Sequence, residues 1–242
     1  MTDRTELDNL AIDQIQSVKL VMNTGVRYHS EQRAVIEIRT KRLGEGLAFN
    51  VKGNLLQGTH FSQNYQMNGS YNYKNWDFFL SYSYNRGKKD SDLDIYQQTQ
   101  SDTVWNLTNL NRKRIFQESH AYTGGVSYHF SPESEIGLKY EGKYSQGNTF
   151  SNDTLSMIPD KGVSTFIRNL SEVGDKSVSN HLNLYYTNDW ENGWRMNVYG
   201  DYLHKTDRSQ GNIREWESDR SETSMDYYRK ADWDLFAAKF SL

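Results

Sequence analysis

Three aspartates of this sequence alternate as the ligands do at the start of a calcium-binding loop. They are Asp90, Asp92 and Asp94, with one residue between each. The sixth position of such a loop would be Ile95 instead of glycine, and the twelfth would be Ser101 instead of glutamate. The pattern therefore fails as a calcium loop, and we expect an acidic loop tip in solvent.

The histidines offer no metal or catalytic pattern either. The six are His29, His60, His120, His129, His181 and His204. No two have the H-x-x-x-H spacing, and the chain has no cysteine to complete a zinc site. No nucleophile elbow or phosphate-binding glycine motif occurs, and no spacing singles out a catalytic triad. We expect no catalytic residue, no metal and no cofactor, and the sequence assigns no ligand-binding residue.

Any such residue would have to be positioned by β-strands. Between residues 64 and 85 every second side chain is apolar or aromatic, or glycine, on both sides of the pair Lys74-Asn75. The set is Tyr65, Met67, Gly69, Tyr71 and Tyr73, then Trp76, Phe78, Leu80, Tyr82 and Tyr84. The change of phase across Lys74-Asn75 puts both halves on one face of a hairpin. Each run has about 10 residues, the length with which a tilted strand crosses a bilayer.

Composition agrees with strands. Only 36% of the 242 residues are hydrophobic but 14% are aromatic, which suits pleated surfaces better than a helical core. The net charge of −3 does not indicate the positive charge that nucleic-acid-binding proteins carry. No apolar run is long enough for a transmembrane helix. A mean hydropathy of −0.88 is still compatible with a barrel, whose lipid face is hidden by alternation.

The connections between strands are sorted by length. Short turns at 74–75, 131–134 and 191–193 alternate with long polar spans at 87–117, 147–177 and 206–231. This is typical of outer-membrane barrels, with periplasmic turns on one side and extracellular loops on the other. Trp76, Phe130, Trp190 and Trp194 lie beside the short turns, where an interfacial aromatic girdle is expected. A soluble β-sandwich or jelly roll also alternates, but it would not sort its loops and aromatics in this way.

The predicted fold is all-β: an antiparallel, up-and-down transmembrane β-barrel segment of about eight strands. We expect an open, strongly curved sheet with unpaired first and last edges. Its concave polar face is predicted to include Lys139, Glu141, Asn197 and Asp201. In the final run we assign the following side chains to the outward face: Phe236, Ala238, Phe240 and Leu242.

Residues 12–42 resemble the end of the plug domain of TonB-dependent outer-membrane receptors. Residues that match the family's patterns are Ile12, Ile15 and Val18, then Asn23, Arg27 and Tyr28, then Val35, Ile36, Ile38, Thr40 and Lys41. Thr24 and Glu37 depart from the proline and asparagine that are common in the family.

The resemblance implies that 1–44 is the C-terminal remnant of a plug and 45–242 the N-terminal part of a barrel. It also implies import of a scarce or bulky nutrient ligand across the outer membrane of a Gram-negative bacterium. The partners would be outer-membrane lipid, the extracellular ligand, and TonB acting through the missing N-terminal plug part; nucleic acid is not expected. On this hypothesis the chain is a fragment of a larger transporter and is not an enzyme.

Two alternatives remain open at this stage. One is a complete eight-stranded barrel with a structural or adhesive role, which would need a hydrogen-bonded ladder between 46–56 and 233–242. The other is a barrel-type hydrolase, for which His120 and His204 are near strand ends on the side of the long spans.

Overall fold

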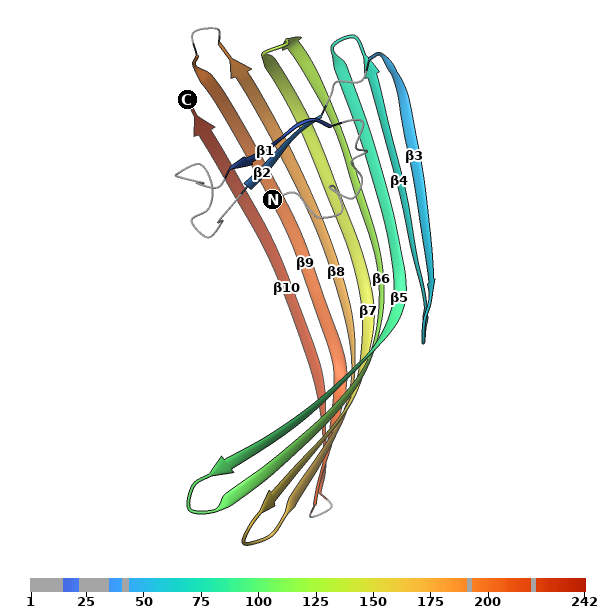
Figure 1. The fold of residues 1–242 in the computed structure, drawn as a ribbon, viewed down its shortest axis with the longest axis vertical. Coiled ribbons are helices and arrows are strands. Elements are labelled where there is room, and N and C mark those ends of the chain that lie inside the picture. The colour runs from blue at the N-terminus through green and yellow to red at the C-terminus, as the bar shows by residue number, and fades with distance from the viewer. Residues whose placement is uncertain (1–14, 22–34, 41–43, 191–192, 219–220) are drawn as a thin grey trace.

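The computed structural model describes residues 15–21, 35–40, 44–190, 193–218 and 221–242. Its elements are β1 (Ile15–Val21), β2 (Val35–Thr40), β3 (Gly46–Gln57), β4 (Phe61–Tyr73), β5 (Trp76–Gln100), β6 (Val104–Ser131), β7 (Ser134–Pro159), β8 (Thr165–Asp189), β9 (Arg195–Glu217) and β10 (Glu222–Ser241). β3 to β10 form one eight-stranded antiparallel sheet in chain order, and β1 and β2 form a separate pair (Figure 1). The predicted all-β, up-and-down architecture is confirmed.

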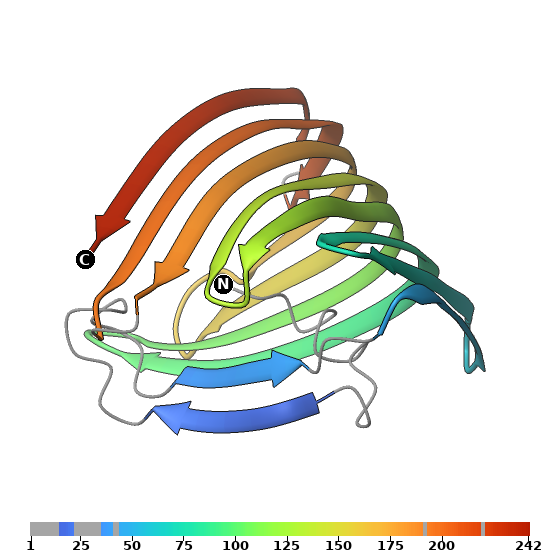
Figure 2. The same cartoon turned by 90° about the horizontal axis from the view of Figure 1, so that it is seen from above.

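The sheet is open. β3 and β10 lie at its two edges, and among the described residues neither pairs with the other. Figures 1 and 2 show a strongly curved sheet that does not close on itself. The expected open arrangement is therefore confirmed, and the ladder that a closed eight-stranded barrel requires is not formed.

The short turns lie together at one end of the sheet, as predicted. Lys74 takes a φ of 52°, which reverses the chain between β4 and β5. At the next short turn the Glu133 amide donates to Ser131 Oγ at 3.2 Å. In the third, Gly193 takes a φ of 87°, and its amide donates to the Trp190 carbonyl at 3.0 Å.

The three long spans are not loops, and this part of the prediction was wrong. β5 to β9 are 23 to 28 residues long, so the strands continue through most of these spans. The chain reverses only between β5 and β6, between β7 and β8, and between β9 and β10. The spans do emerge at the end opposite the short turns, as expected from the topology. Strands with polar side chains on both faces show no alternation, which is why the sequence pattern stopped short of them.

The large sheet has no hydrophobic core. Within the described ranges no hydrophobic side chain is buried. A soluble two-sheet sandwich would bury one face of each sheet, so the structure does not match that alternative. Across the same ranges no helix is long and apolar enough to span a bilayer.

Within the segment that resembles a plug, β1 and β2 pair antiparallel, with an irregularity between Ile15 and Ser17. The connecting segment with Asn23, Arg27 and Tyr28 lies outside the described residues, as do Ile12 and Lys41. The division of the chain at residue 44 therefore stays a prediction.

Candidate functional site: the two faces of the sheet

The register places the aromatic sets of the central hairpin on one face. Tyr65 pairs directly with Tyr84, and Tyr71 with Phe78. Directly opposite residues of an antiparallel pair share a face, and the Tyr71 and Phe78 rings stack with centroids 6.2 Å apart. The predicted shared face is confirmed.

This face is apolar across all eight strands. One row shows the continuity, in which successive cross-strand partners are Phe49, Gly69, Leu80, Gly124, Tyr140, Leu182, Tyr202 and Phe236. Tyr202 and Phe236 stack at 4.6 Å, which confirms the outward assignment of Phe236. We call this surface the apolar belt; its members include Leu47, Phe49, Val51, Met67, Tyr71, Phe78, Leu80, Tyr122, Val126, Leu138, Tyr140, Leu182, Leu184, Val198, Tyr202, Phe236 and Phe240.

Aromatic rings border the apolar belt at the short-turn end. Trp76 packs on Tyr128 at 4.8 Å, and Tyr128 meets Phe130 edge-on at 5.0 Å. Trp190 and Trp194 are joined by a backbone hydrogen bond of 2.8 Å beside their turn. The predicted position of the aromatics at this end is confirmed.

A second aromatic row borders the apolar belt on the other side, and the sequence interpretation missed it. His120 lies 4.8 Å from the Tyr84 ring and 6.2 Å from the Tyr144 ring, and its Nδ1 is 2.8 Å from Tyr82 Oη. Along β6 the two aromatic borders lie at His120 and Phe130. The strand between them is about 34 Å long, at roughly 3.4 Å per residue. A strand tilted by about 40° would give the apolar belt a height near 26 Å, close to the apolar band of barrels.

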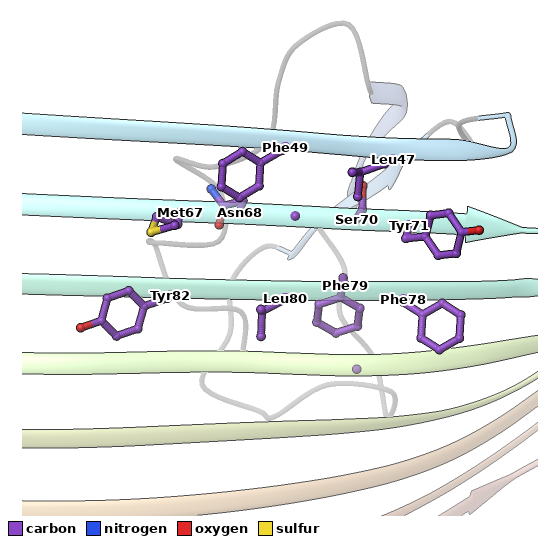
Figure 3. Close-up of a pocket in the computed structure, with 12 residues that line it drawn as sticks. Leu47, Phe49, Met67, Asn68, Ser70, Tyr71, Phe78, Phe79, Leu80 and Tyr82 are labelled. Atoms are coloured by element: carbon purple, nitrogen blue, oxygen red, sulfur yellow. The ribbon is translucent and has the colours of Figure 1, made fainter.

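A shallow groove of about 560 Å³ lies within the apolar belt, where β3, β4 and β5 meet. Its walls include Phe49, Met67, Phe78 and Leu80 (Figure 3). Gly69 lies between them, and its missing side chain leaves the space in front of Phe49 open. The groove has the chemistry of a hydrocarbon-contacting surface.

The opposite face is polar at the same height. His181 bridges two carboxylates, with Nδ1 3.0 Å from Glu141 Oε2 and Nε2 2.9 Å from Asp201 Oδ1. Lys139 Nζ lies 2.6 Å from Glu141 Oε1, and Asn183 donates to Asp201 at 2.8 Å. The predicted placement of Lys139, Glu141 and Asp201 on this face is confirmed, and the structure adds His181 as the group that joins them.

Asn197 lies on the same polar face, where its side-chain amide donates to Ser241 Oγ at 3.3 Å. A charged, hydrogen-bonded surface of this kind suits a water-filled space.

The aspartate repeat is not at a loop tip, which corrects the sequence interpretation. It lies within β5, where Asp90 pairs with Arg114 and Asp92 with Arg112 of β6. Arg114 Nε donates to Asp90 at 3.1 Å, and Arg112 also contacts Asp94. Opposite charges across neighbouring strands favour this register.

The pKa of Asp90 is held below its ordinary value by hydrogen bonds from His60 and then from Arg114. Likewise the hydrogen bond from Arg112 lowers the pKa of Asp94. These carboxylates therefore stay ionised in mildly acidic solution and support the extended hairpin.

The two histidines considered for hydrolysis lie in different surroundings. His120 is among tyrosines, as described above. His204 Nδ1 is 2.9 Å from Asp234, which also accepts from Tyr202 Oη at 2.9 Å. The cross-strand positions beside His204 on this face are Asn180 and Asp234, so the described rows bring no serine to it. Over the described ranges no three His, Cys, Asp or Glu side chains are grouped to hold a metal ion.

Beyond the apolar belt, the polar-face side of the long hairpins carries an amide cluster. Asn111 and Asn169 both pair with Asp153, and Asn109 lies in the adjacent row beside Leu155. The side-chain oxygens of Asn109 and Asn169 are buried without a hydrogen-bond partner among the described residues. Buried carbonyl oxygens of this kind can accept from a bound molecule.

No family model and no curated protein matches the chain. Among solved structures, the CymD monoaromatic hydrocarbon channel is 9% identical over 93% of this chain and 85% of that one, with a TM-score of 0.25. The siderophore receptor PiuA from Acinetobacter baumannii is 9% identical over 86% of this chain and 48% of that one, with a TM-score of 0.19. BamA from Haemophilus ducreyi lacking POTRA domains 1–3 is 6% identical over 98% of this chain and 77% of that one, with a TM-score of 0.14. TM-scores of this size do not establish a common fold.

Proposed function

We propose that this sheet is part of the wall of a β-barrel transporter in the outer membrane of a Gram-negative bacterium. The apolar belt would face lipid and the face with Glu141, His181 and Asp201 would face the aqueous lumen. The observation that carries the proposal is the continuity of the belt: it runs in register across eight strands and is bordered by aromatic rings.

The exposure of the belt supports a lipid environment. Leu80 is 64% exposed and Phe236 is 77% exposed, although both lie in the middle row of the belt. A contiguous apolar surface of this extent is unfavourable in water and promotes aggregation. Lipid chains would cover it without any further protein layer.

The unpaired edge strands of the sheet support a barrel with more than eight strands. In a bilayer core every backbone N–H and C=O must be paired, so β3 and β10 cannot stay as open edges there. We propose that additional strands pair with both of them. Such a barrel would be wider than one of eight strands, whose interior is filled by its own side chains.

The more specific proposal is TonB-dependent import of a scarce or bulky nutrient ligand. It is supported by the residues of β1 and β2 that resemble the end of a receptor plug, such as Val35, Ile36 and Ile38. The amide cluster with Asn109 and Asn169 would offer acceptors to a ligand near the outer end. TonB would act on the plug from the periplasmic side.

Cysteine labelling tests the wall, because the chain has no cysteine of its own. Leu80→Cys and Ser81→Cys are neighbours on opposite faces of β5 and serve as matched controls. In outer membranes, a fluorophore at residue 80 should be quenched by brominated acyl chains, and residue 81 should react with a water-soluble maleimide. Equal behaviour of the two positions would contradict the proposed wall.

Import is tested in a host that carries this protein as its receptor, with and without TonB. Ferric enterobactin, cyanocobalamin and maltoheptaose would be supplied singly as limiting nutrients. We expect growth on one of these probes to need both this protein and TonB. Growth that needs this protein but not TonB would show passive diffusion and overturn TonB dependence, leaving the wall assignment standing.

A further inference from the structure

Just beyond the second aromatic row, the same face as the apolar belt carries adjacent cations. Lys176 of β8 pairs directly with Arg208 of β9, and Arg208 pairs directly with Lys230 of β10. Like charges placed directly opposite on neighbouring strands repel each other. The arrangement is stabilised if an anion lies among them.

The nearby carboxylates are already engaged. Asp232 contacts Lys230 Nζ at 2.5 Å, and Glu118 accepts from Tyr84 at 2.8 Å and from Gln146 at 3.1 Å. Asp175 points to the opposite face, where Ser209 Oγ donates to it at 2.5 Å. Lys176 and Arg208 are exposed. Their combined charge exceeds that of Asp232, which lies opposite Thr206 in the adjacent row.

A groove of about 360 Å³ lies at these cations. Besides Lys176 and Arg208, the residues that line it include Gln146, Asn148, Gln210 and Tyr228, together with Phe116 and Asp175. Gly174 lies in the same row as Asn148 and Gln210, and a Cβ there would lie 3.1 Å from Asn148 Oδ1. The missing side chain keeps the groove open among groups that donate hydrogen bonds to oxyanions.

We propose that this groove binds the phosphate of a phosphorylated lipid headgroup whose acyl chains lie along the apolar belt. The inference rests on the proposed membrane function. Its position argues for a lipid rather than a free anion. Tyr144 and Val178 lie directly opposite each other at the border of the apolar belt, one row closer to the short-turn end than Gln146 and Lys176. A phosphate in the groove would therefore lie at the depth of headgroups, where basic residues meet anionic lipid.

The test uses the protein extracted from outer membranes in neutral detergent, with dioctanoyl phosphatidic acid and dioctanoyl phosphatidylcholine as probes. Native mass spectrometry measures the bound lipid. We expect phosphatidic acid to bind more tightly than phosphatidylcholine, and the K176Q/R208Q variant to lose about tenfold of that affinity. The control K89Q/K113Q removes the same charge from the opposite face of β5 and β6 and should bind as the unchanged protein does.

Four other results would contradict the lipid site, the proposed function or both. Equal affinity for the two lipids would overturn the phosphate site, and so would an equal loss of phosphatidic acid affinity in both double variants. In either case the labelling of residues 80 and 81 would still support the sheet as the wall of a barrel. Inorganic phosphate that displaces phosphatidic acid at equal concentration would overturn the lipid as the source. Failure of the labelling experiment would overturn the proposed function, and the lipid site with it.

Discussion

Leu80→Arg is expected to destabilise the folded protein in a bilayer by about 2–4 kcal/mol, the cost of a basic side chain near the midplane of a barrel's lipid face. Leu80 lies midway between the aromatic borders at Trp76 and Tyr84 on β5. The measurement uses the complete barrel, in which β3 and β10 are paired, and takes its urea midpoint in phosphatidylcholine vesicles, followed by the heat-modifiable migration of the folded form.

Thr123→Arg is the matched control for Leu80→Arg. Thr123 pairs with Ser81 on one side and Glu141 on the other, so it lies at nearly the same height on the polar face. An arginine there can pair with Glu141 and stay in water, and we expect a change below about 0.5 kcal/mol. Equal stability of the two variants in vesicles would contradict a lipid-facing belt.

The stability of the Leu80→Arg variant distinguishes a lipid-facing belt from a belt that lies in water. In water, a leucine that is 64% exposed can be replaced by arginine at little cost. Only when hydrocarbon surrounds residue 80 does the same substitution strongly lower the free energy of unfolding.

Gly211→Ala is expected to destabilise the sheet by about 1–3 kcal/mol, a usual range for overpacking. A Cβ at residue 211 would lie 2.2 Å from the backbone oxygen of Glu172 and 2.9 Å from Val173 Cα. These are backbone atoms of β8, so they cannot rotate away and the two strands must shift. The expected readout is a lower urea midpoint with an unchanged slope.

Gly200→Ala, in the same strand, is the control for Gly211. Nothing lies within 4 Å of a Cβ at residue 200. The alanine should therefore be neutral, or stabilise by up to about 1 kcal/mol through the unfolded chain. If both alanines behave alike, the close approach of β9 to β8 at Gly211 is contradicted.

Much of the sheet could be predicted because its information is local. Side chains of a strand alternate between faces, so the sequence from Tyr65 to Tyr84 determined a hairpin with one aromatic face. The turn at Lys74-Asn75 followed from the change of phase between the two runs. The same alternation placed Phe236 and Phe240 on the belt side and Lys139 and Glu141 on the other.

Only the tertiary structure decided how far the strands run and what they bring together. The segments beyond Arg86 lack alternation because water solvates both faces, so only the pairing of Asp90 with Arg114 reveals that they are strands. The row of Lys176, Arg208 and Lys230 joins residues that are distant in sequence, and no local pattern contains it. The open edges at β3 and β10 are non-local in the same way: whether a sheet closes depends on curvature and register summed over every strand.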